Sequence, residues 1–218
     1  IKPDNFRFPN IRPGALIDVF SRTGLSIVGF KVHRMSVAEA EEFYGPVLPV
    51  LEEHFKVSHG ERLKELVENE FSVRLSEGDH DAIAETVGPI IGRRHWENLV
   101  QFMSGKRPGE VTDSERLLPG HHKTIALVYE GEDAVKKIRE VLGPTDPSKA
   151  PAGTIRREFG TTVMINAAHA SDSPENAQRE MGLVGVGENV FEPFVEGLFA
   201  AEENESDGLV KKIRNLFQ

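Results

Sequence analysis

Apolar residues recur at helical spacing near the start of the chain. One helical face of residues 13–23 carries Leu16, Ile17, Val19 and Phe20. A proline stands near the beginning of this segment, and Gly24 follows its end, which is the usual arrangement at helix termini. The pattern predicts an amphipathic helix over residues 13–23.

The next segment changes to the two-residue period of a strand. Ser26, Val28, Phe30 and Val32 share one face, and Ile27 lies on the other. We therefore expect a strand that is buried on at least one side. Ser36-Val-Ala-Glu39 then forms a capping box, which predicts a helix that runs to about Tyr44.

Residues 45–94 interrupt this alternation. The segment has an apolar stretch with two prolines, a charged helical pattern over residues 60–71 and an acidic turn at Glu77-Gly78-Asp79. Too few apolar residues are present for an independent core. We interpret the segment as an insertion and not as a second domain; a helical pattern returns at Trp96–Met103.

The remaining half of the chain predicts more strands and helices. We expect strands at residues 124–129 and 161–167, and helices at residues 135–142 and from Ser173-Pro174 onward. The first residues read like the end of a strand, so we expect upstream residues before Lys2. The resulting order predicts an α+β sandwich, in which helices pack on an antiparallel sheet.

Length and charge limit the possible functions. A chain of 218 residues is long enough for one large domain. Its formal net charge of −9 argues against nonspecific binding to nucleic acid or to an anionic membrane surface. No apolar run approaches the roughly 18 residues of a spanning helix. The absence of cysteine excludes disulfides and thiolate chemistry and fits a cytoplasmic location.

The most informative stretch runs from Asn166 to Pro174. A histidine, His169, stands at the expected end of a strand, and polar residues then open a helix. Helix N-termini attract phosphate, and a neutral imidazole beside one is a candidate nucleophile toward a phosphoryl group. The alternative is that His169 satisfies a hydrogen bond at the strand end and that the cap is structural.

Other motifs carry less chemistry. His121 and His122 are adjacent and would point to opposite faces of an extended chain, which disfavours a shared metal. His54 and His59 lie in charged surroundings that are typical of a solvated surface. The glycine-rich Gly-x-x-x-x-Gly-Lys-Ser/Thr loop is absent, which excludes a P-loop kinase.

The stretch Asn166-Ala-Ala-His169-Ala-Ser171-Asp172-Ser173 resembles the active-site motif of the nucleoside diphosphate kinase family, Asn-x-x-His-Gly/Ala-Ser-Asp-Ser, without a gap. Further blocks resemble the family in the same order. They are Lys2-Pro3-Asp4, the helix Ala38–Tyr44, Glu130–Lys137, Leu142–Pro151 and Gly153–Arg156.

The resemblance implies a ferredoxin-like βαββαβ sandwich with a helical insertion. It makes residues 1–218 a single domain, with the insertion at about 45–94 and a C-terminal extension at about 185–218. The implied reaction moves the γ-phosphoryl group of a nucleoside triphosphate to a nucleoside diphosphate through a phosphohistidine. Mg²⁺ would enter on the nucleotide phosphates, and the protein itself would hold no metal.

The resemblance also assigns residues one by one. His169 aligns with the phosphorylated histidine, and Glu180 with the carboxylate that orients it. Lys2 aligns with the lysine that neutralises charge on the migrating group, and Tyr44 with the tyrosine near it. The residues that align with the family's phosphate and ribose contacts are Arg139, Thr145, Arg156 and Asn166.

The chain departs from the family pattern at four places. His95 takes the place of the aromatic residue under the base, with Leu99 as its companion. Met164-Ile165 replaces the usual Gly-Arg before Asn166. Roughly 50 residues are inserted after Tyr44, with a smaller polar insertion after Met103. The C-terminal extension contains an apolar stripe within Phe191–Phe199 and a basic amphipathic end at Leu209–Phe217.

Two interpretations follow. The first is an active phosphotransferase, which the presence of His169 and its charged neighbours favours. The second is a catalytically silent relative that binds nucleotide or a partner protein. The family implies a homo-oligomer, but the insertion and the extension add surfaces, so the subunit number need not be the usual hexamer. We expect the stripe within Phe191–Phe199 to dock on its own subunit or on a neighbour.

Overall fold

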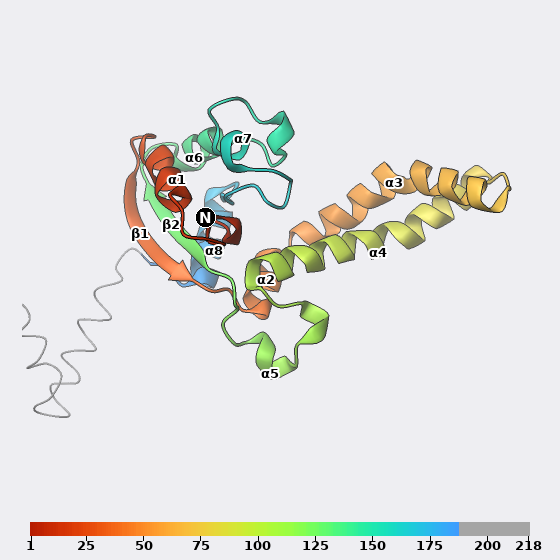
Figure 1. Ribbon diagram of the computed structural model, residues 1–218, viewed down its shortest axis with the longest axis horizontal. Helices are drawn as coiled ribbons and strands as arrows, with labels where there is room; N and C mark the ends of the chain where they lie inside the picture. The colour runs from red at the N-terminus through yellow and green to blue at the C-terminus, as the bar shows by residue number, and fades with distance from the viewer. Residues whose placement is uncertain (188–218) are drawn as a thin grey trace, which may run out of the picture.

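Two antiparallel strands form the sheet of the computed structural model, which describes residues 1–187 (Figure 1). Strand β1 (Ser26–His33) pairs with β2 (Thr124–Glu130), with Phe30 opposite Leu127. The register shifts between Ile27 and Gly29. Both strands lie where the sequence pattern predicts them.

The burial of β1 differs from our expectation. Ile27, Phe30 and Val32 are 45%, 47% and 54% exposed, and the buried position is Gly29. A Cβ atom on Gly29 would lie 2.9 Å from Val128, so β1 meets its neighbour most closely through the residue without a side chain. We expected burial on at least one side; residues 1–187 leave the Phe30 and Val32 side chains exposed, and the position that packs closely is Gly29.

Ile1 continues the sheet on the far side of β2. Its amino group donates to Ile125 O at 2.7 Å, and Ile125 N donates back to Ile1 O at 3.2 Å. This exchange is the hydrogen-bond pattern of an antiparallel pair. The amide of Lys2 then donates to Ala167 O, so residues 1 and 2 lie between β2 and the segment that ends at Ala167.

The strand predicted over residues 161–167 is not present. The segment turns back on itself, because the amides of Thr161 and Thr162 both donate to Ile165 O. At the end of the segment, Ala167 O accepts from the amide of Lys2. The apolar run Val163–Ile165 was not sufficient to define a strand here, because the amides of Thr161 and Thr162 bond within the segment.

Helices build two apolar clusters around the sheet. In one cluster, α1 (Arg12–Ser21), α6 (Ala134–Leu142) and α7 (Ile155–Phe159) pack on one another. In the other, α2 (Val37–Phe43) packs against α8 (Pro174–Val184) and the end of α4. The short elements are η1 (Pro3–Asn5), η2 (Pro108–Glu110), α5 (Asp113–Arg116) and η3 (Pro147–Lys149).

Two long helices project from this body as an antiparallel pair, which we call the arm (Figure 1). They are α3 (Val47–Phe71) and α4 (Glu77–Ser104). The acidic residues Glu77–Asp79, predicted as a turn, form the first turn of α4, where Ser76 and Asp79 make a capping box. The segment predicted at Trp96–Met103 is the last part of the same helix.

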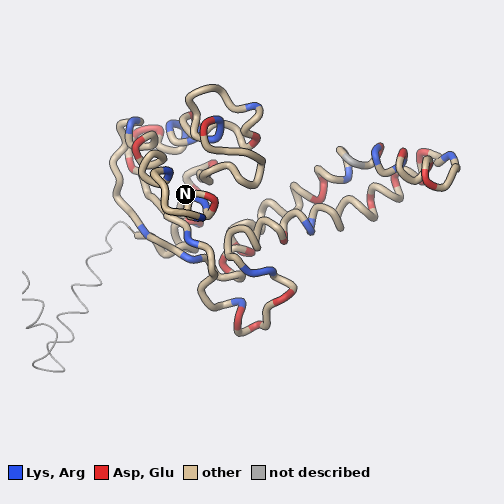
Figure 2. The backbone as a smooth tube through the Cα atoms, viewed as in Figure 1, with Lys and Arg blue, Asp and Glu red and all other residues tan. Residues whose placement is uncertain are grey.

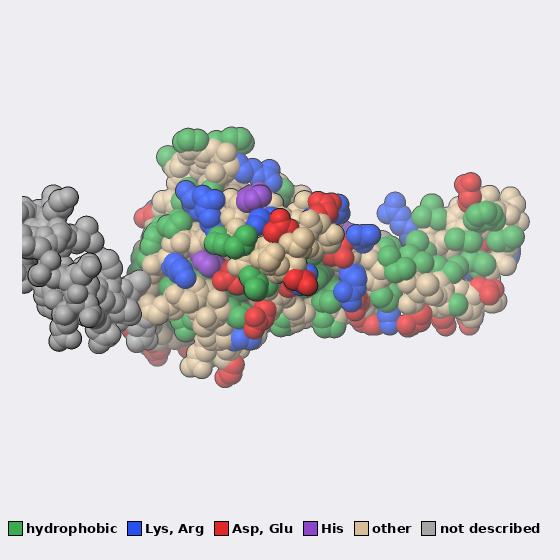
Figure 3. All heavy atoms as spheres, turned by 90° about the horizontal axis from the view of Figure 1, so that it is seen from below, with side chains coloured by type: hydrophobic (Ala, Val, Ile, Leu, Met, Phe, Trp, Pro, Cys, Tyr) green, Lys and Arg blue, Asp and Glu red, His purple; other side chains and the backbone are tan. Residues whose placement is uncertain are grey.

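The arm is held by close backbone approach and by charge pairs. A Cβ atom on Gly88 or Gly92 would lie 2.6 Å from Lys56 or from Glu52, so the two glycines let α3 and α4 meet. Lys56 reaches across to Glu85 at 2.7 Å. Acidic and basic residues occur along both helices in Figure 2. Figure 3 shows that hydrophobic side chains are also exposed on the surface of the arm, among the charged ones.

Within residues 1–187, no helix has the length and apolar character needed to cross a membrane. The apolar stripe within Phe191–Phe199 and the basic segment Leu209–Phe217 lie outside the described residues.

Candidate active site

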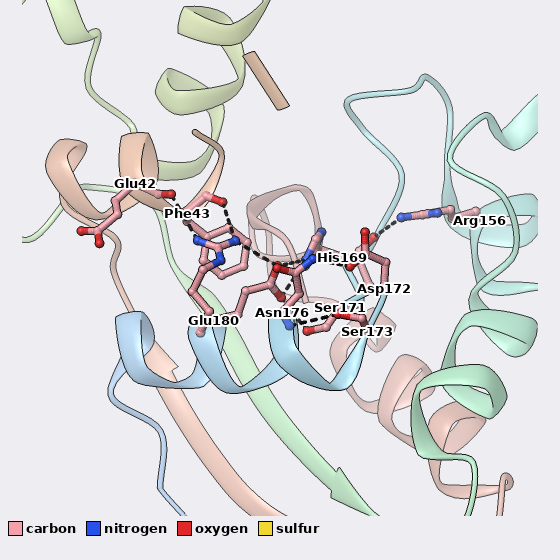
Figure 4. Close-up of polar contacts among 11 residues, drawn as sticks. Glu42, Phe43, Arg156, His169, Ser171, Asp172, Ser173, Asn176 and Glu180 are labelled. Carbon is pink, nitrogen blue, oxygen red and sulfur yellow. Dashed lines mark hydrogen bonds and ion pairs between the residues drawn. The ribbon is translucent and has the colours of Figure 1, made fainter. Parts of the chain in front are cut away.

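His169 lies in the loop before α8 and Glu180 lies within α8, and their side chains meet (Figure 4). Nε2 of His169 lies 3.1 Å from Oε1 and 3.0 Å from Oε2 of Glu180. An ionised carboxylate only accepts hydrogen bonds, so Nε2 carries the proton in this pair. In the neutral imidazole, the lone pair is then on the other ring nitrogen, Nδ1.

The carboxylate of Glu180 is kept ionised by its neighbours. Its side chain is 12% exposed, and burial on its own would raise the pKa. Hydrogen bonds from His169 and Ser171, together with the charges of His169 and Arg179, instead lower the pKa of Glu180 below its usual value. Ser171 Oγ donates to Glu180 Oε2 at 2.6 Å. The pair is thus fixed in the arrangement that directs Nδ1 away from Glu180.

The local sequence explains how His169 and Glu180 come together. Ser173 caps α8 by accepting from Asn176 N, and Pro174 occupies the first helical position. Asn176 also donates to Asp172 at 2.6 Å. These bonds start the helix at Pro174, five residues after His169, so the second turn of α8 brings Glu180 back beside the imidazole.

Two aromatic rings from the end of α2 pack against His169. The ring of Phe43 lies 5.2 Å and the ring of Tyr44 6.0 Å from the imidazole, both edge-on. Burial, followed by the charge of Glu180, raises the pKa of Tyr44, so its hydroxyl is neutral. That hydroxyl is buried and has no hydrogen-bond partner among the described residues. Trp96 Nε1 donates to Tyr44 O at 2.9 Å and so connects α4 to the end of α2.

Lys2 is buried close to the same place. Its Nζ donates to Asn166 Oδ1 at 2.6 Å and to Met164 O at 3.2 Å. Burial, and then the charge of Arg156, lowers the pKa of Lys2 to about 8. A cavity of about 260 Å³ is lined by Lys2, Tyr44, His169 and Glu180, together with residues of β2. Four of the predicted catalytic side chains therefore face one space.

Asn166 connects three segments in the interior. Besides accepting from Lys2, it donates through Nδ2 to Thr145 O at 2.9 Å and to Val163 O at 2.8 Å. The next residue, Ala167, has a φ of +71°, a left-handed conformation that is uncommon outside glycine. Asp4 and Asn5 hold the peptide groups of Ala167, and so fix the turn that leads to His169.

Three other predicted residues line an open cleft of about 1190 Å³ beside the cavity: Arg139, Thr145 and Arg156. Arg156 is buried and donates to Gly143 O at 2.9 Å and to Ala168 O at 3.1 Å. Burial, and then the charge of Arg139, lowers the pKa of Arg156 to about 10, so it remains charged at neutral pH. Two cations therefore face the cleft near the residue that precedes His169.

The structure keeps His95 and Leu99 apart from these groups. His95 is exposed on the arm and stacks on Phe55 of α3, with ring centroids 4.4 Å apart. Leu99 packs against the cluster formed by α2, α4 and α8. Neither residue lines the cavity or the cleft. Their assignment to base stacking stays a prediction.

Arg179 is a residue at the site that our sequence reasoning missed. It lies 3.6 Å from Glu180 Oε1 and donates to the last carbonyls of α2. Its only sequence signal is its place next to Glu180. Among residues 1–187, no group of three or more histidine, aspartate or glutamate side chains is arranged to hold a metal ion.

Comparisons with known proteins agree with this geometry. The family model described as nucleoside diphosphate kinase matches residues 118–188. A nucleoside diphosphate kinase of Hydrogenovibrio crunogenus is 54% identical over 57 residues, which are 26% of this chain and 40% of that protein. The chain thus spans about two fifths of that relative's length.

Longer matches cover most of the chain. A nucleoside diphosphate kinase of Saccharolobus solfataricus is 32% identical over 183 residues, which are 84% of this chain and 88% of that protein. The crystal structure of the Aquifex aeolicus nucleoside diphosphate kinase superposes with a TM-score of 0.51 at 28% identity, covering 84% of this chain and 89% of that one.

Fold and site together define an α+β protein of ferredoxin-like type, in which a histidine paired with a glutamate lines a cavity beside a cleft that holds two arginines. The chain belongs to the nucleoside diphosphate kinase family.

Proposed function

We propose that this chain is a nucleoside diphosphate kinase that works by a ping-pong mechanism through a phosphohistidine on His169. The observation that carries the proposal is the pairing of Nε2 of His169 with both oxygens of Glu180. This pairing leaves Nδ1 as the nucleophile and lets the carboxylate stabilise the positive charge that develops on the ring when Nδ1 bonds to phosphorus.

The first half-reaction forms the phosphoenzyme. The Nδ1 lone pair attacks the γ-phosphorus of a nucleoside triphosphate, and the bond from that phosphorus to the bridging oxygen breaks. The nucleoside diphosphate leaves with the bridging electron pair. In the second half-reaction, a terminal oxygen of another nucleoside diphosphate attacks the phosphorus, and the nitrogen–phosphorus bond breaks to restore His169. The proton on Nε2 stays in its bond with Glu180 throughout.

Cationic and neutral donors supply the stabilisation that phosphoryl transfer requires. Lys2 and Tyr44 line the cavity with His169, and the Tyr44 hydroxyl has a proton to donate. Arg139, Thr145 and Arg156 line the adjoining cleft and are proposed to hold the nucleotide phosphates. Mg²⁺ enters bound to those phosphates as part of the substrate.

We assign nucleobase binding to the end of the arm that joins the body. We propose that a nucleobase stacks on His95, whose exposed imidazole already stacks on Phe55, with Leu99 beside it. The arrangement offers an aromatic surface without a base-specific pattern of donors, which fits a kinase that accepts different nucleobases. Asn166 is proposed to contact the ribose.

The silent relative remains a second candidate because of Lys2 and Asn166. Their polar atoms are satisfied by each other and by Met164, Thr145 and Val163. A nucleotide that used the amide nitrogen of Asn166 would have to break its bonds to Thr145 and Val163, and Lys2 Nζ has one donor beyond the two already in use. A protein that binds nucleotide without transferring phosphate would keep these bonds.

We also propose that the chain assembles into a homo-oligomer in the cytoplasm. Exposed apolar side chains on the edge strand β1, among them Phe30 and Val32, support a surface that a second copy covers. The lack of cysteine supports a reducing compartment.

A labelling experiment separates the two candidates. Incubation with ATP labelled at the γ position is expected to give a phosphoenzyme that is stable in base and labile in acid, and addition of UDP is expected to move the label to UTP. His169→Ala should form no phosphoenzyme and should unfold at the same temperature as the wild type. Labelled protein from His169→Ala, or no label in the wild type with nucleotide still bound, would contradict the proposal.

A further inference from the structure

The side chain of Arg179 joins α8 to the end of α2, the two helices that flank His169. One of its guanidinium nitrogens donates to Glu42 O and another to Phe43 O, each at 3.3 Å. The second nitrogen also lies 3.6 Å from Oε1 of Glu180. Arg179 belongs to α8, whereas Glu42 and Phe43 end α2 (Figure 4 shows these two carbonyls facing α8).

The two carbonyls lie at the end of α2, where Glu42 O also accepts from Gly45 N at 3.4 Å. The last carbonyls of an α-helix have no intrahelical donor and carry the negative end of the helix dipole. A planar guanidinium presents its donors to two neighbouring acceptors in a fixed fork, whereas a lysine ammonium is a compact charge on a flexible stem. Arg179 therefore fixes the direction in which α2 ends.

That direction matters for His169. Phe43 and Tyr44 are the residues at which α2 ends, and both rings lie edge-on to the imidazole. The guanidinium also lies 6.0 Å from the centre of the Phe43 ring. A shift of the α2 end would move the surface against which the imidazole rests.

Arg179 acts on the opposite side of His169 as well. Its charge stands beside the carboxylate oxygen that holds Nε2, and Arg179 is one of the groups that lower the pKa of Glu180. The other groups that face this carboxylate are His169 and Ser171, while Tyr44 from α2 and Lys2 line the same cavity.

We propose that Arg179 is a positioning residue for the phosphorylated histidine. It clamps the end of α2 to α8 and thereby holds the His169 ring between Phe43 and Glu180. This inference rests on the proposed function for its consequence in catalysis. Arg179 does not line the cavity or the cleft, so its effect reaches the reacting atoms through His169 and Glu180.

The test uses two variants and two phosphoryl donors. Arg179→Gln removes both the positive charge and the planar guanidinium donors, whereas Arg179→Lys keeps only the positive charge. Phosphoenzyme formation is followed with ATP and with phosphoramidate, which transfers its phosphoryl group to histidine, releases ammonia and carries no nucleotide. Misplacement of a reacting group by about 1 Å costs on the order of a hundredfold, so we expect Arg179→Gln to slow phosphorylation by roughly ten- to a hundredfold with either donor.

Three further readouts distinguish positioning from simple support of the fold. Arg179→Gln should lower kcat and leave KM for the nucleotide near its wild-type value. In the pH profile of its phosphoenzyme formation, the acid limb should move to higher pH. The reason is that loss of a neighbouring cation raises the pKa of Glu180. Arg179→Lys should restore the acid limb and only part of the rate. Arg107→Gln is the matched control, since Arg107 is 38% exposed against 34% for Arg179 and pairs with Glu110 away from the site.

Each contrary result is informative. Wild-type rates in Arg179→Gln with both donors would overturn the positioning role. A fall in melting temperature with an unmoved acid limb and a raised KM would show that Arg179 only supports the fold. If the wild type reacts with phosphoramidate but not with ATP, the proposed kinase function fails, while the comparison of variants with phosphoramidate still decides the role of Arg179.

Discussion

Nζ of Lys2 donates a 2.6 Å hydrogen bond to Oδ1 of Asn166, which stands 164 positions later in the chain. The contact brings the first residues of the chain against the turn that leads to His169. It also holds a lysine in a buried place where its charge is costly, so protonation of Lys2 depends on pH in an accessible range.

We expect the rate of phosphoryl transfer to fall as the pH rises through about 8, the value to which burial lowers the pKa of Lys2. Lys2 is charged below that pH and neutral above it, so the cation is available at neutral pH and is lost in mild alkali. The measurement is a pH profile of phosphoenzyme formation. Lys2→Ala should be slower at neutral pH and should lack this alkaline limb; an unchanged limb would assign it to another group.

Arg139→Ala should reduce turnover more than nucleotide affinity. Arg139 lines the cleft beside Arg156, and charge directed at a migrating phosphoryl group is felt mainly in the transition state. Steady-state kinetics over a range of ATP concentrations gives kcat and KM separately. Arg22→Ala is the control, since Arg22 is 73% exposed and pairs with Asp18 on α1. A rise in KM alone would mean that Arg139 only binds nucleotide.

Gly92→Ala should destabilise the arm. The added Cβ would lie 2.6 Å from backbone atoms of Glu52, and overpacking of this kind costs about 1–3 kcal/mol. Gly14→Ala in α1 meets nothing within 4 Å, and a helical Gly→Ala change at a tolerant position gains about 0.4–1 kcal/mol. Chemical denaturation monitored by circular dichroism compares the two. Equal stability of both variants would show that α3 and α4 separate without cost.

Deletion of residues 188–218 should give smaller particles in light scattering, since the stripe within Phe191–Phe199 is expected to dock on a neighbouring subunit. The deletion begins after Val186 because Val184 and Val186 are buried in the core. Phosphoenzyme formation serves as the control for folding. Particles of unchanged mass with normal activity would exclude the segment from assembly.

Helices with clear termini were predictable from the sequence. For α2, the Ser36 and Glu39 pair makes the capping box that the sequence indicates, and for α8 the Ser173 cap and Pro174 occur as expected. These signals are local, because a capping side chain bonds to an amide only three residues away. Local signals need no knowledge of the rest of the fold.

The arm was harder to predict because glycines form part of its contact. Gly88 and Gly92 meet the backbone of α3 at Lys56 and Glu52, so the inner face of α4 carries no hydrophobic stripe there. The segment over residues 161–167 failed for the opposite reason. Its apolar residues resemble a strand, but strand formation depends on an available partner, and its amides bond within the segment.

At the site, the motif pointed to His169 and the family resemblance to Glu180, and the structure brings the two within hydrogen-bond distance. Arg179 could not be found in the same way, because its partners are backbone carbonyls of Glu42 and Phe43. Any residue type presents a carbonyl, so no pattern in the sequence marks the acceptor.

The geometry of the arm has a consequence for how the chain can change through evolution. Val100 and Met103 anchor the end of α4 in the core, whereas residues 72–76 join the two helices at the far tip. Paired gain or loss of whole helical turns at the tip would alter the reach of the arm and leave the core phase of both helices intact. The reach of the arm can therefore change at its tip without altering how its two helices join the core.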